Sequence, residues 1–281
     1  MTTTRTITRT ALVTGASSGI GEETARRLQG LGYTVYGAAR RTDRLEKLAA
    51  EGVRPLAMDV TDDASMTAGI ARIIEEAGRI DVLVNNAGYG SYGAIEDVPI
   101  DEARRQFEVN LFGLGRLVQL VTPHMRGQKS GTIINISSMG GRLTTPLGGW
   151  YHATKYAVEA LSDALRMELK PFGIDVVLVE PGGIRTEWAG IAADHLEETA
   201  EGSAYSDQIR AVAGSMRNES VQRRQSPPSV IANTVEKIVT ARKPRTRYAV
   251  GFMAKPLITA RRVLPDRVFD RVISAALGVP R

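Results

Sequence analysis

Short apolar runs alternate with helical patterns along most of the chain, and this alternation constrains the fold more than any other feature. Runs such as "ALVTG" at 11–15 and "DVVLVEP" at 175–181 are largely apolar, as expected for strands that helices cover on both faces. Strand–helix alternation predicts an α/β fold with a doubly wound, mostly parallel sheet. The seven expected strands are 11–15, 33–39, 54–60, 81–87, 132–138, 175–181 and 247–251. The expected helices lie near 19–30, 42–50, 62–77, 101–126, 150–171 and 229–241.

The chain has 281 residues, 43% of them hydrophobic, with no internal repeat and no clear linker. An α/β unit of this length is commonly one domain, so we expect a single domain spanning 1–281. Residues 187–228 break the strand–helix rhythm with helical, acidic and Gly/Ser-rich pieces. A long irregular insertion beside a sheet edge is often a lid, and we expect 187–228 to form one.

The chain contains no cysteine, which excludes disulfides, thiolate catalysis and thiolate metal sites. We expect no metal site. The polar start "MTTTRTITRT" lacks the apolar middle of a signal peptide, and no apolar run reaches the length of a transmembrane helix. These features favour a cytoplasmic protein.

Positive charge gathers near the C-terminus, where residues 217–281 hold 14 Lys/Arg against 4 Asp/Glu. Such a basic tail can meet an anionic membrane surface or a nucleic acid. No nucleic-acid-binding motif accompanies it, so we expect no nucleic-acid partner. A plain solvated face is favoured over contact with a membrane surface.

A glycine-rich stretch, "TGASSGIG" at 14–21, follows the first expected strand directly. Glycines there permit a tight turn and let backbone N–H groups approach a pyrophosphate. The helix that follows offers its positive N-terminal end to the phosphates. The spacing differs from the G-x-G-x-x-G fingerprint, but its position after the first strand indicates a dinucleotide site.

The end of the second strand indicates which dinucleotide binds. An NAD site generally carries an acidic residue about 20 residues beyond the glycines, whereas an arginine there can hold a 2′-phosphate. Here Arg40 and Arg41 come first and the first acid is Asp43. Two guanidinium groups suit bidentate phosphate binding, so we predict NADP(H), with a solvated pair of loop arginines as the alternative.

Two further strand ends carry candidate cofactor contacts. Asp59 follows the third strand, where it either accepts a hydrogen bond from an adenine amino group or caps the helix near 62. "NNAG" at 85–88 closes the fourth strand, where it packs against a bound ribose or forms a simple turn.

Ser138 ends the fifth strand, and Tyr151 and Lys155 stand four residues apart on the next expected helix. A lysine ammonium about 4–6 Å from a phenol favours the ionised phenol, which lowers its pKa toward the working pH. The alternative is two ordinary residues on one helix face. A serine nucleophile would need a paired base, and the chain has three histidines and no G-x-S-x-G elbow. We therefore predict that Ser138 donates a hydrogen bond to a substrate oxygen.

"TGASSGIG", "NNAG", a serine thirteen residues before "YHATK", and "PGGIRT", in this order, resemble the motifs of the short-chain dehydrogenase/reductase family over about residues 10–190. The resemblance implies a Rossmann-type fold and an NADP-dependent oxidoreductase that transfers a hydride between nicotinamide and a ketone, aldehyde or secondary alcohol. It implies a catalytic tetrad of Asn110, Ser138, Tyr151 and Lys155. Tyr151 would be the acid/base, Ser138 would hold the substrate oxygen, Lys155 would lower the phenol pKa and bond the ribose, and Asn110 would support a water.

The resemblance also implies the cofactor contacts. Besides Tyr151 and Lys155 these are Gly15, Ser17, Ser18, Gly19, Ile20, Gly21, Arg40, Arg41, Asp59, Val60, Asn86, Ala87, Gly88, Pro181, Gly182, Ile184 and Thr186.

Within the family the chain resembles members that act on steroids, retinoids and other bulky or apolar carbonyl compounds. The residues that we expect to line the substrate site are apolar or aromatic: Tyr89, Met139, Leu143, Trp150, Trp188 and parts of 189–222. Core packing is an equal alternative for Met139 and Leu143. The family implies NADPH-dependent carbonyl reduction and a homodimer or homotetramer. The alternative function is a catalytically silent NADP(H)-binding sensor or scaffold.

Overall fold

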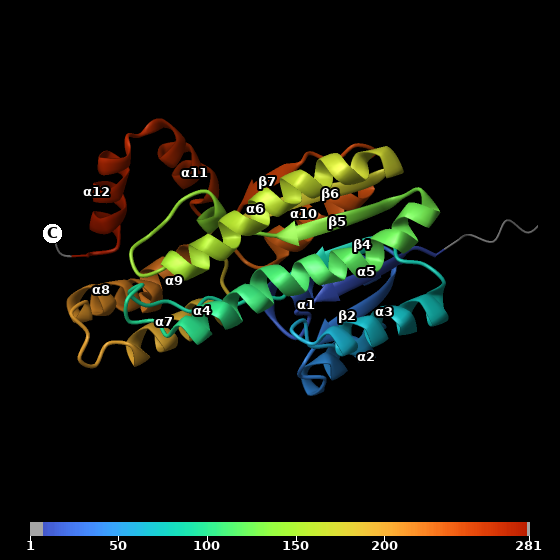
Figure 1. Cartoon of the computed structure of the whole chain (residues 1–281), viewed down its shortest axis with the longest axis horizontal. Helices are drawn as coiled ribbons and strands as arrows, with labels where there is room; N and C mark the ends of the chain where they lie inside the picture. Colours follow the sequence, from blue (N-terminus) through green and yellow to red (C-terminus); the bar gives the residue numbers. More distant parts are fainter. Residues whose placement is uncertain (1–7, 280–281) are drawn as a thin grey trace, which may run out of the picture.

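A seven-stranded, fully parallel sheet forms the centre of the protein (Figure 1), and the computed structural model describes residues 8–279. Its strand order is β3-β2-β1-β4-β5-β6-β7, which confirms the predicted doubly wound, Rossmann-type fold. The strands are β1 (Thr10–Thr14), β2 (Thr34–Ala39), β3 (Arg54–Ala57), β4 (Val82–Asn85), β5 (Gly131–Ile136), β6 (Ile174–Pro181) and β7 (Arg247–Val250). Most of the N-terminal stretch "MTTTRTITRT", from which no signal peptide was expected, lies outside the described residues.

Alternate strand residues face opposite layers of helices, because successive side chains of a strand point to opposite faces. Leu12, Leu83 and Ile133 pack with residues of the helices α3 (Asp63–Ala77), α5 (Gly113–Gln128) and α6 (Gly149–Leu169). Their neighbours Val13, Val84 and Ile134 pack with residues of α1 (Gly19–Gly30) and α10 (Ser229–Thr240) on the other face. Both faces of the sheet are therefore buried, which accounts for the largely apolar strands.

The helices that cover the sheet lie close to the expected ranges. They are α1 (Gly19–Gly30), α2 (Glu46–Ala50), α3 (Asp63–Ala77), α4 (Ile100–Phe107), α5 (Gly113–Gln128), α6 (Gly149–Leu169) and α10 (Ser229–Thr240). A π-helical turn, η2 (Glu108–Phe112), joins α4 to α5, so the single helix expected at 101–126 is interrupted by a wider turn. Such turns frequently mark functional positions.

The segment expected to be an irregular insertion is mostly helical, with α7 (Trp188–Glu198), α8 (Ser206–Arg217) and α9 (Glu219–Arg224). Ala192, Leu196 and Val212 of this segment are buried together with Tyr92 and Tyr151. Two C-terminal helices, α11 (Ala254–Val263) and α12 (Asp266–Ala276), lie within the basic tail. Figure 1 shows both groups of helices at the end of the sheet toward which β5 points.

The described residues contain neither a helix that is long and apolar enough to span a membrane nor a cluster of His, Asp and Glu side chains suited to hold a metal ion.

Candidate active site

The glycine-rich turn lies where the strand order reverses, since β1 pairs with both β2 and β4. Gly15 has a φ of 63°, in the left-handed region that favours glycine. A Cβ on Gly21 would lie 2.2 Å from the Gly15 carbonyl oxygen, so only glycine lets α1 start this close to the turn. Ser18 is the N-cap residue of α1, and its side chain makes no capping bond. The helix N-terminus, with the Ser18 hydroxyl not used as a cap, suits a pyrophosphate, and Ile20 packs its side chain against the core.

"NNAG" is fastened to the first strand end rather than forming a simple turn. The Thr14 hydroxyl accepts hydrogen bonds from the backbone N–H groups of Asn86 and Ala87, both at 3.0 Å. Asn86 Nδ2 also donates to Thr14 O at 2.9 Å. A Cβ on Gly88 would lie 3.0 Å from Asn110 Oδ1 and 3.7 Å from Lys155 Nζ. The expected cofactor segment thus lies directly against two members of the expected tetrad.

The "PGGIRT" segment after β6 closes the same end of the sheet. The Gly182 N–H donates to Val250 O at 2.8 Å, and the Arg185 N–H donates to Ser226 O at 2.9 Å. The Thr186 methyl group lies opposite Gly19, where an added Cβ would be 3.1 Å away. Residues 181–186 therefore lie against the glycine-rich turn, and Ile184 in this segment is buried.

Arg40 and Arg41 follow β2 and are exposed. Burial raises the pKa of the nearby Asp59, but hydrogen bonds from the Thr61 N–H and hydroxyl and the charge of Arg40 hold it below its usual value. The capping alternative for Asp59 is wrong, because Asp62 caps α3 by accepting from the N–H groups of Ala64 and Ser65. Val60 stands next to Asp59, and its carbonyl faces Gly113 of α5.

A cleft of about 350 Å³ opens beside the glycine-rich turn, lined by Ser17, Ser18, Glu22, Asp43, Arg44, Glu46, Lys47 and Glu187. Arg44 and Glu187 form an ion pair of 3.1 Å, which joins the loop after β2 to the segment after β6. The sequence interpretation missed this pair and Lys47. The run of charges at 40–47 was visible, but its partner stands 143 residues away.

Asn110 lies in the π-helical turn and is almost fully buried. Its Oδ1 accepts from the Tyr89 N–H at 3.0 Å, and its Nδ2 donates to Tyr89 O at 2.9 Å and to the Thr154 hydroxyl at 3.1 Å. Asn110 thereby ties the loop after β4 to α6, which carries Tyr151 and Lys155.

The Tyr151 side chain is only 7% exposed, and the Ser138 side chain is its hydrogen-bonding neighbour. Burial raises the pKa of Tyr151 to about 12, and the hydrogen bond with Ser138 opposes that shift. Ser138 Oγ also accepts from the Gly140 N–H at 2.9 Å. The expectation that Lys155 lowers the phenol pKa is not met by the protein alone, because desolvation outweighs the other influences on this buried ring.

Lys155 is as buried as Tyr151, and its Nζ donates to Ile136 O at 3.0 Å. Nζ lies 6.0 Å from the centre of the Tyr151 ring. Burial lowers the pKa of Lys155 to about 8, and the charge of Glu159 acts in the opposite direction. The four expected catalytic residues are therefore brought together beside "NNAG" at the carboxyl end of the sheet, where ligands bind in folds of this type.

Three aromatic residues surround Tyr151, and sequence interpretation recognised only one as a lining candidate. The ring of Tyr151 lies 5.3 Å from Trp188 and 5.7 Å from Tyr92, centre to centre. His152 Nδ1 lies 3.0 Å from Gly140 O, and its Nε2 accepts from the Thr145 N–H at 3.1 Å. Burial lowers the pKa of His152 to about 4, so this ring is neutral near pH 7 and holds the loop after Ser138. The second tyrosine in "YGSYGA" was the available signal for Tyr92.

The other lining candidates make contacts outside this aromatic group. Met139 and Leu143 pack against Phe269 and Ile273 of α12, which favours the core alternative for both. The Tyr89 hydroxyl donates to Glu102 on α4 at 3.0 Å. Trp150 has a buried indole N–H without a partner among the described residues.

Comparison with known proteins agrees with this geometry. Residues 9–196 match the family model of short chain dehydrogenases. The chain is 38% identical to a 3-ketodihydrosphingosine reductase of Bacteroides thetaiotaomicron, over 92% of this chain and 94% of that protein. It is 34% identical to an NADPH-dependent 3-dehydrocapnine reductase of Ornithobacterium rhinotracheale, over 94% and 95%. A solved short-chain dehydrogenase from Streptomyces avermitilis superposes with a TM-score of 0.79 and 36% identity, over 95% of both chains.

The chain belongs to the short-chain dehydrogenase family. It is thus an oxidoreductase of a family that uses nicotinamide cofactors and acts on small molecules.

Proposed function

We propose that the protein is an NADP(H)-dependent reductase of ketones or aldehydes that also catalyses the reverse oxidation of secondary alcohols. The observation that carries the proposal is the buried Tyr151 hydroxyl, with Ser138 as its hydrogen-bonding neighbour and Lys155 one helical turn away. The glycine-rich turn, the Ser18 hydroxyl, which makes no capping bond, and the N-terminus of α1 would provide the donors that a dinucleotide requires. Arg40 and Arg41 would hold the 2′-phosphate.

In this mechanism the bound cofactor supplies the hydride, and the chain's own residues manage charge and the proton. Tyr151 holds its proton near neutral pH because its pKa lies above 7. It would donate that proton to the carbonyl oxygen as negative charge grows there. Ser138 would donate a second hydrogen bond to the same oxygen, and Lys155 would bond the ribose. Asn110 would fix the loop and helix that position both groups.

We further propose a bulky or largely apolar substrate. The aromatic rings of Tyr92 and Trp188 beside Tyr151 support an apolar pocket, and so do the two relatives whose names describe reduction at a 3-keto or 3-dehydro position. We propose that 187–228 acts as the lid of this pocket, in a single catalytic domain spanning 1–281. No observation favours the catalytically silent sensor or scaffold.

The oligomeric state and the cellular location are also proposals. Phe112, in the turn η2 that joins α4 to α5, and Met167, on α6, are 55% and 67% exposed, which supports the expected homodimer or homotetramer. The cytoplasmic location rests on the sequence alone.

A panel of ketones and aldehydes of increasing apolar size, each assayed with NADPH and with NADH, tests the proposal. We expect nicotinamide oxidation that depends on substrate, is faster with NADPH and improves with apolar size. Absence of turnover across the panel, in protein that binds NADPH, would favour the silent alternative.

A further inference from the structure

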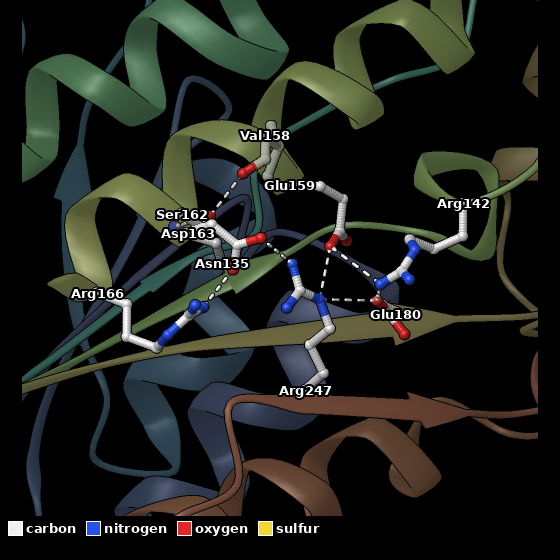
Figure 2. Close-up of polar contacts among 9 residues, drawn as sticks. All are labelled: Asn135, Arg142, Val158, Glu159, Ser162, Asp163, Arg166, Glu180 and Arg247. Atoms are coloured by element: carbon white, nitrogen blue, oxygen red, sulfur yellow. Dashed lines mark hydrogen bonds and ion pairs between the residues drawn. The ribbon is translucent and has the colours of Figure 1, made fainter.

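A group of charges that includes two buried carboxylates lies between α6 and the edge of the sheet (Figure 2). Arg247 of β7 lies 3.0 Å from Glu159 of α6 and 3.4 Å from Glu180 of β6. Arg142, which follows the short helical turn η3 (Met139–Gly141), lies 3.1 Å from Glu180 and 3.9 Å from Glu159. Four segments that are distant in sequence meet here through two carboxylates and two guanidiniums.

The two glutamates are the most buried members of the group, with side chains 8% and 4% exposed. Burying a carboxylate costs free energy unless opposite charges and hydrogen bonds compensate for the lost water. Burial and the neighbouring Glu159 charge raise the pKa of Glu180, although Arg142 and Arg247 oppose this shift. The charge of Glu159 is compensated directly, because Arg247 Nε donates a hydrogen bond to Glu159 Oε2 at 3.0 Å.

Glu159 stands one helical turn beyond Lys155, so both side chains lie on the same face of α6. The backbone of η3 is packed tightly on this face. A Cβ on Gly141 would lie 2.9 Å from Lys155 O, 2.9 Å from Ser137 Oγ and 3.0 Å from Glu159 Cγ. The buried charges and the catalytic loop are thus parts of one packed unit, in which Glu159 Oε1 has no hydrogen-bond donor among the described residues.

We propose that Glu159 is a positioning residue whose carboxylate, fixed by Arg247 and Arg142, keeps the Lys155 side chain a charged ammonium in the active site. The proposal rests on the proposed function, in which that ammonium bonds the ribose. Without a nearby anion, a lysine this buried would give up its proton to escape desolvation. The Glu159 carboxylate offsets that tendency from one helical turn along α6.

The other charged and titratable groups around this unit are either paired or neutral near pH 7. Asp163 of α6 pairs with Arg166 and lies 2.7 Å from Arg247, so its charge is compensated one turn farther from Lys155. Tyr151 precedes Lys155 on α6 and is neutral near pH 7, as is His152. Arg142, Arg247 and Glu180 are the groups that face Glu159 from η3, β7 and β6. Glu159 is the anion whose charge acts on Lys155.

The test measures the protonation of Lys155 directly by NMR of protein labelled at lysine Cε, with saturating NADPH. The chain has seven lysines, and Lys155→Met assigns the resonance. We expect the titration midpoint of Lys155 to fall by about one pH unit in Glu159→Gln, since an opposite charge at close range shifts a pKa by about 1–3 units. Glu159→Asp, which keeps the charge, should restore most of the difference.

Asp163→Asn is the matched control, because it removes a carboxylate that binds the same Arg247 but lies one turn farther away. Its Lys155 midpoint should stay near that of the wild type. An unchanged midpoint in Glu159→Gln, or an equal fall in Asp163→Asn, overturns the proposal. If Glu159→Gln does not fold, Glu159→Gln combined with Arg247→Gln retains the Arg142–Glu180 pair; a downward shift relative to Arg247→Gln alone is then required, and the fall relative to the wild type is smaller, because Arg247→Gln removes a positive charge near Lys155.

The pH profile of turnover separates this inference from the proposed function. The limb of this pH profile that depends on the protonation of Lys155 should move with the NMR titration midpoint in each variant. A shifted midpoint in protein that reduces no carbonyl would contradict the proposed function and leave the effect of Glu159 on Lys155 standing.

Discussion

The two ends of the proposed cofactor site differ in burial and in charge. At the proposed nicotinamide end, Asn110, Tyr151 and Lys155 are buried, and Asn110 and Lys155 donate hydrogen bonds to backbone carbonyls. At the adenine end, Arg40 and Arg41 are exposed on a loop, beside a cleft rich in charged side chains. Geometry fixed by burial therefore serves the proposed chemistry, whereas exposed charge serves the proposed recognition of a phosphate.

The two ends should respond differently to salt and to pH. Exposed charges are screened by salt over about 10 Å at an ionic strength of 0.1 M, while buried groups are screened much less. Buried titratable groups instead respond to pH, because burial shifts their pKa values. The adenine end should thus be sensitive to salt and the nicotinamide end to pH.

The largest expected effect comes from removing the buried hydroxyl. Tyr151→Phe should lower kcat by about 10²–10⁴-fold, the usual contribution of a positioned acid/base group, while NADPH still binds. Steady-state turnover and cofactor titration measure the two quantities. Tyr92→Phe, on the neighbouring ring, should retain most activity; equal losses in both variants would remove the special role of Tyr151.

The exposed end is tested by Arg40→Ala combined with Arg41→Ala. Loss of two charge-assisted contacts should weaken NADPH binding by about 100-fold and leave NADH binding within about twofold. Raising the salt concentration should narrow the difference between wild type and variant. Arg104→Ala, an exposed arginine on α4, is the control. Equal weakening of both cofactors would contradict the 2′-phosphate assignment.

His152 provides a pH test of the buried end. Its pKa is lowered from 6.5 to about 4, so the unfolded chain binds more protons than the folded protein below pH 6.5. Stability should therefore fall as the pH drops from about 6.5 toward 4, by about 2 kcal/mol at pH 5. Urea unfolding at several pH values measures this loss, which should be absent in His152→Gln. His124→Gln should follow the wild type, and parallel pH curves for His152→Gln and wild type would refute the assignment.

The smallest expected effect concerns the proposed lid. Trp188→Ala removes the indole that packs against Tyr151 and Gly90, so KM for a bulky ketone should rise about tenfold, the scale of one aromatic contact. A small ketone should be affected much less. Ile191→Ala, an exposed position on α7, is the control. The same change in KM for small and bulky ketones would argue against a lid that contacts substrate.

The adenine end could be read largely from the sequence, because the signals there are local. The glycine-rich turn follows its strand directly, and Arg40 and Arg41 occupy the end of the next strand. Arg44 was missed as a cleft residue because its partner Glu187 comes from the far half of the sheet. A charged loop residue has many possible partners in a sequence, and only the folded chain selects one.

At the proposed nicotinamide end, the sequence named four residues that the structure brings together, but it did not give their environment. The expected fall in the Tyr151 pKa was wrong for the protein alone, because the spacing of Tyr151 and Lys155 says nothing about how deeply both are buried. No sequence motif assigned a role to Tyr92 or to His152. Their positions beside Tyr151 depend on which segments of the folded chain pack together.

Periodicity and motif order by themselves determined the parallel sheet, the seven strands and the family, because those signals depend on neighbours a few residues apart. Only the tertiary structure decided which charges are buried, which rings surround Tyr151 and that Glu159, Glu180, Arg142 and Arg247 meet behind Lys155. The physical reason is that desolvation and long-range pairing depend on contacts between distant segments, and those contacts exist only once the sheet has brought the segments together.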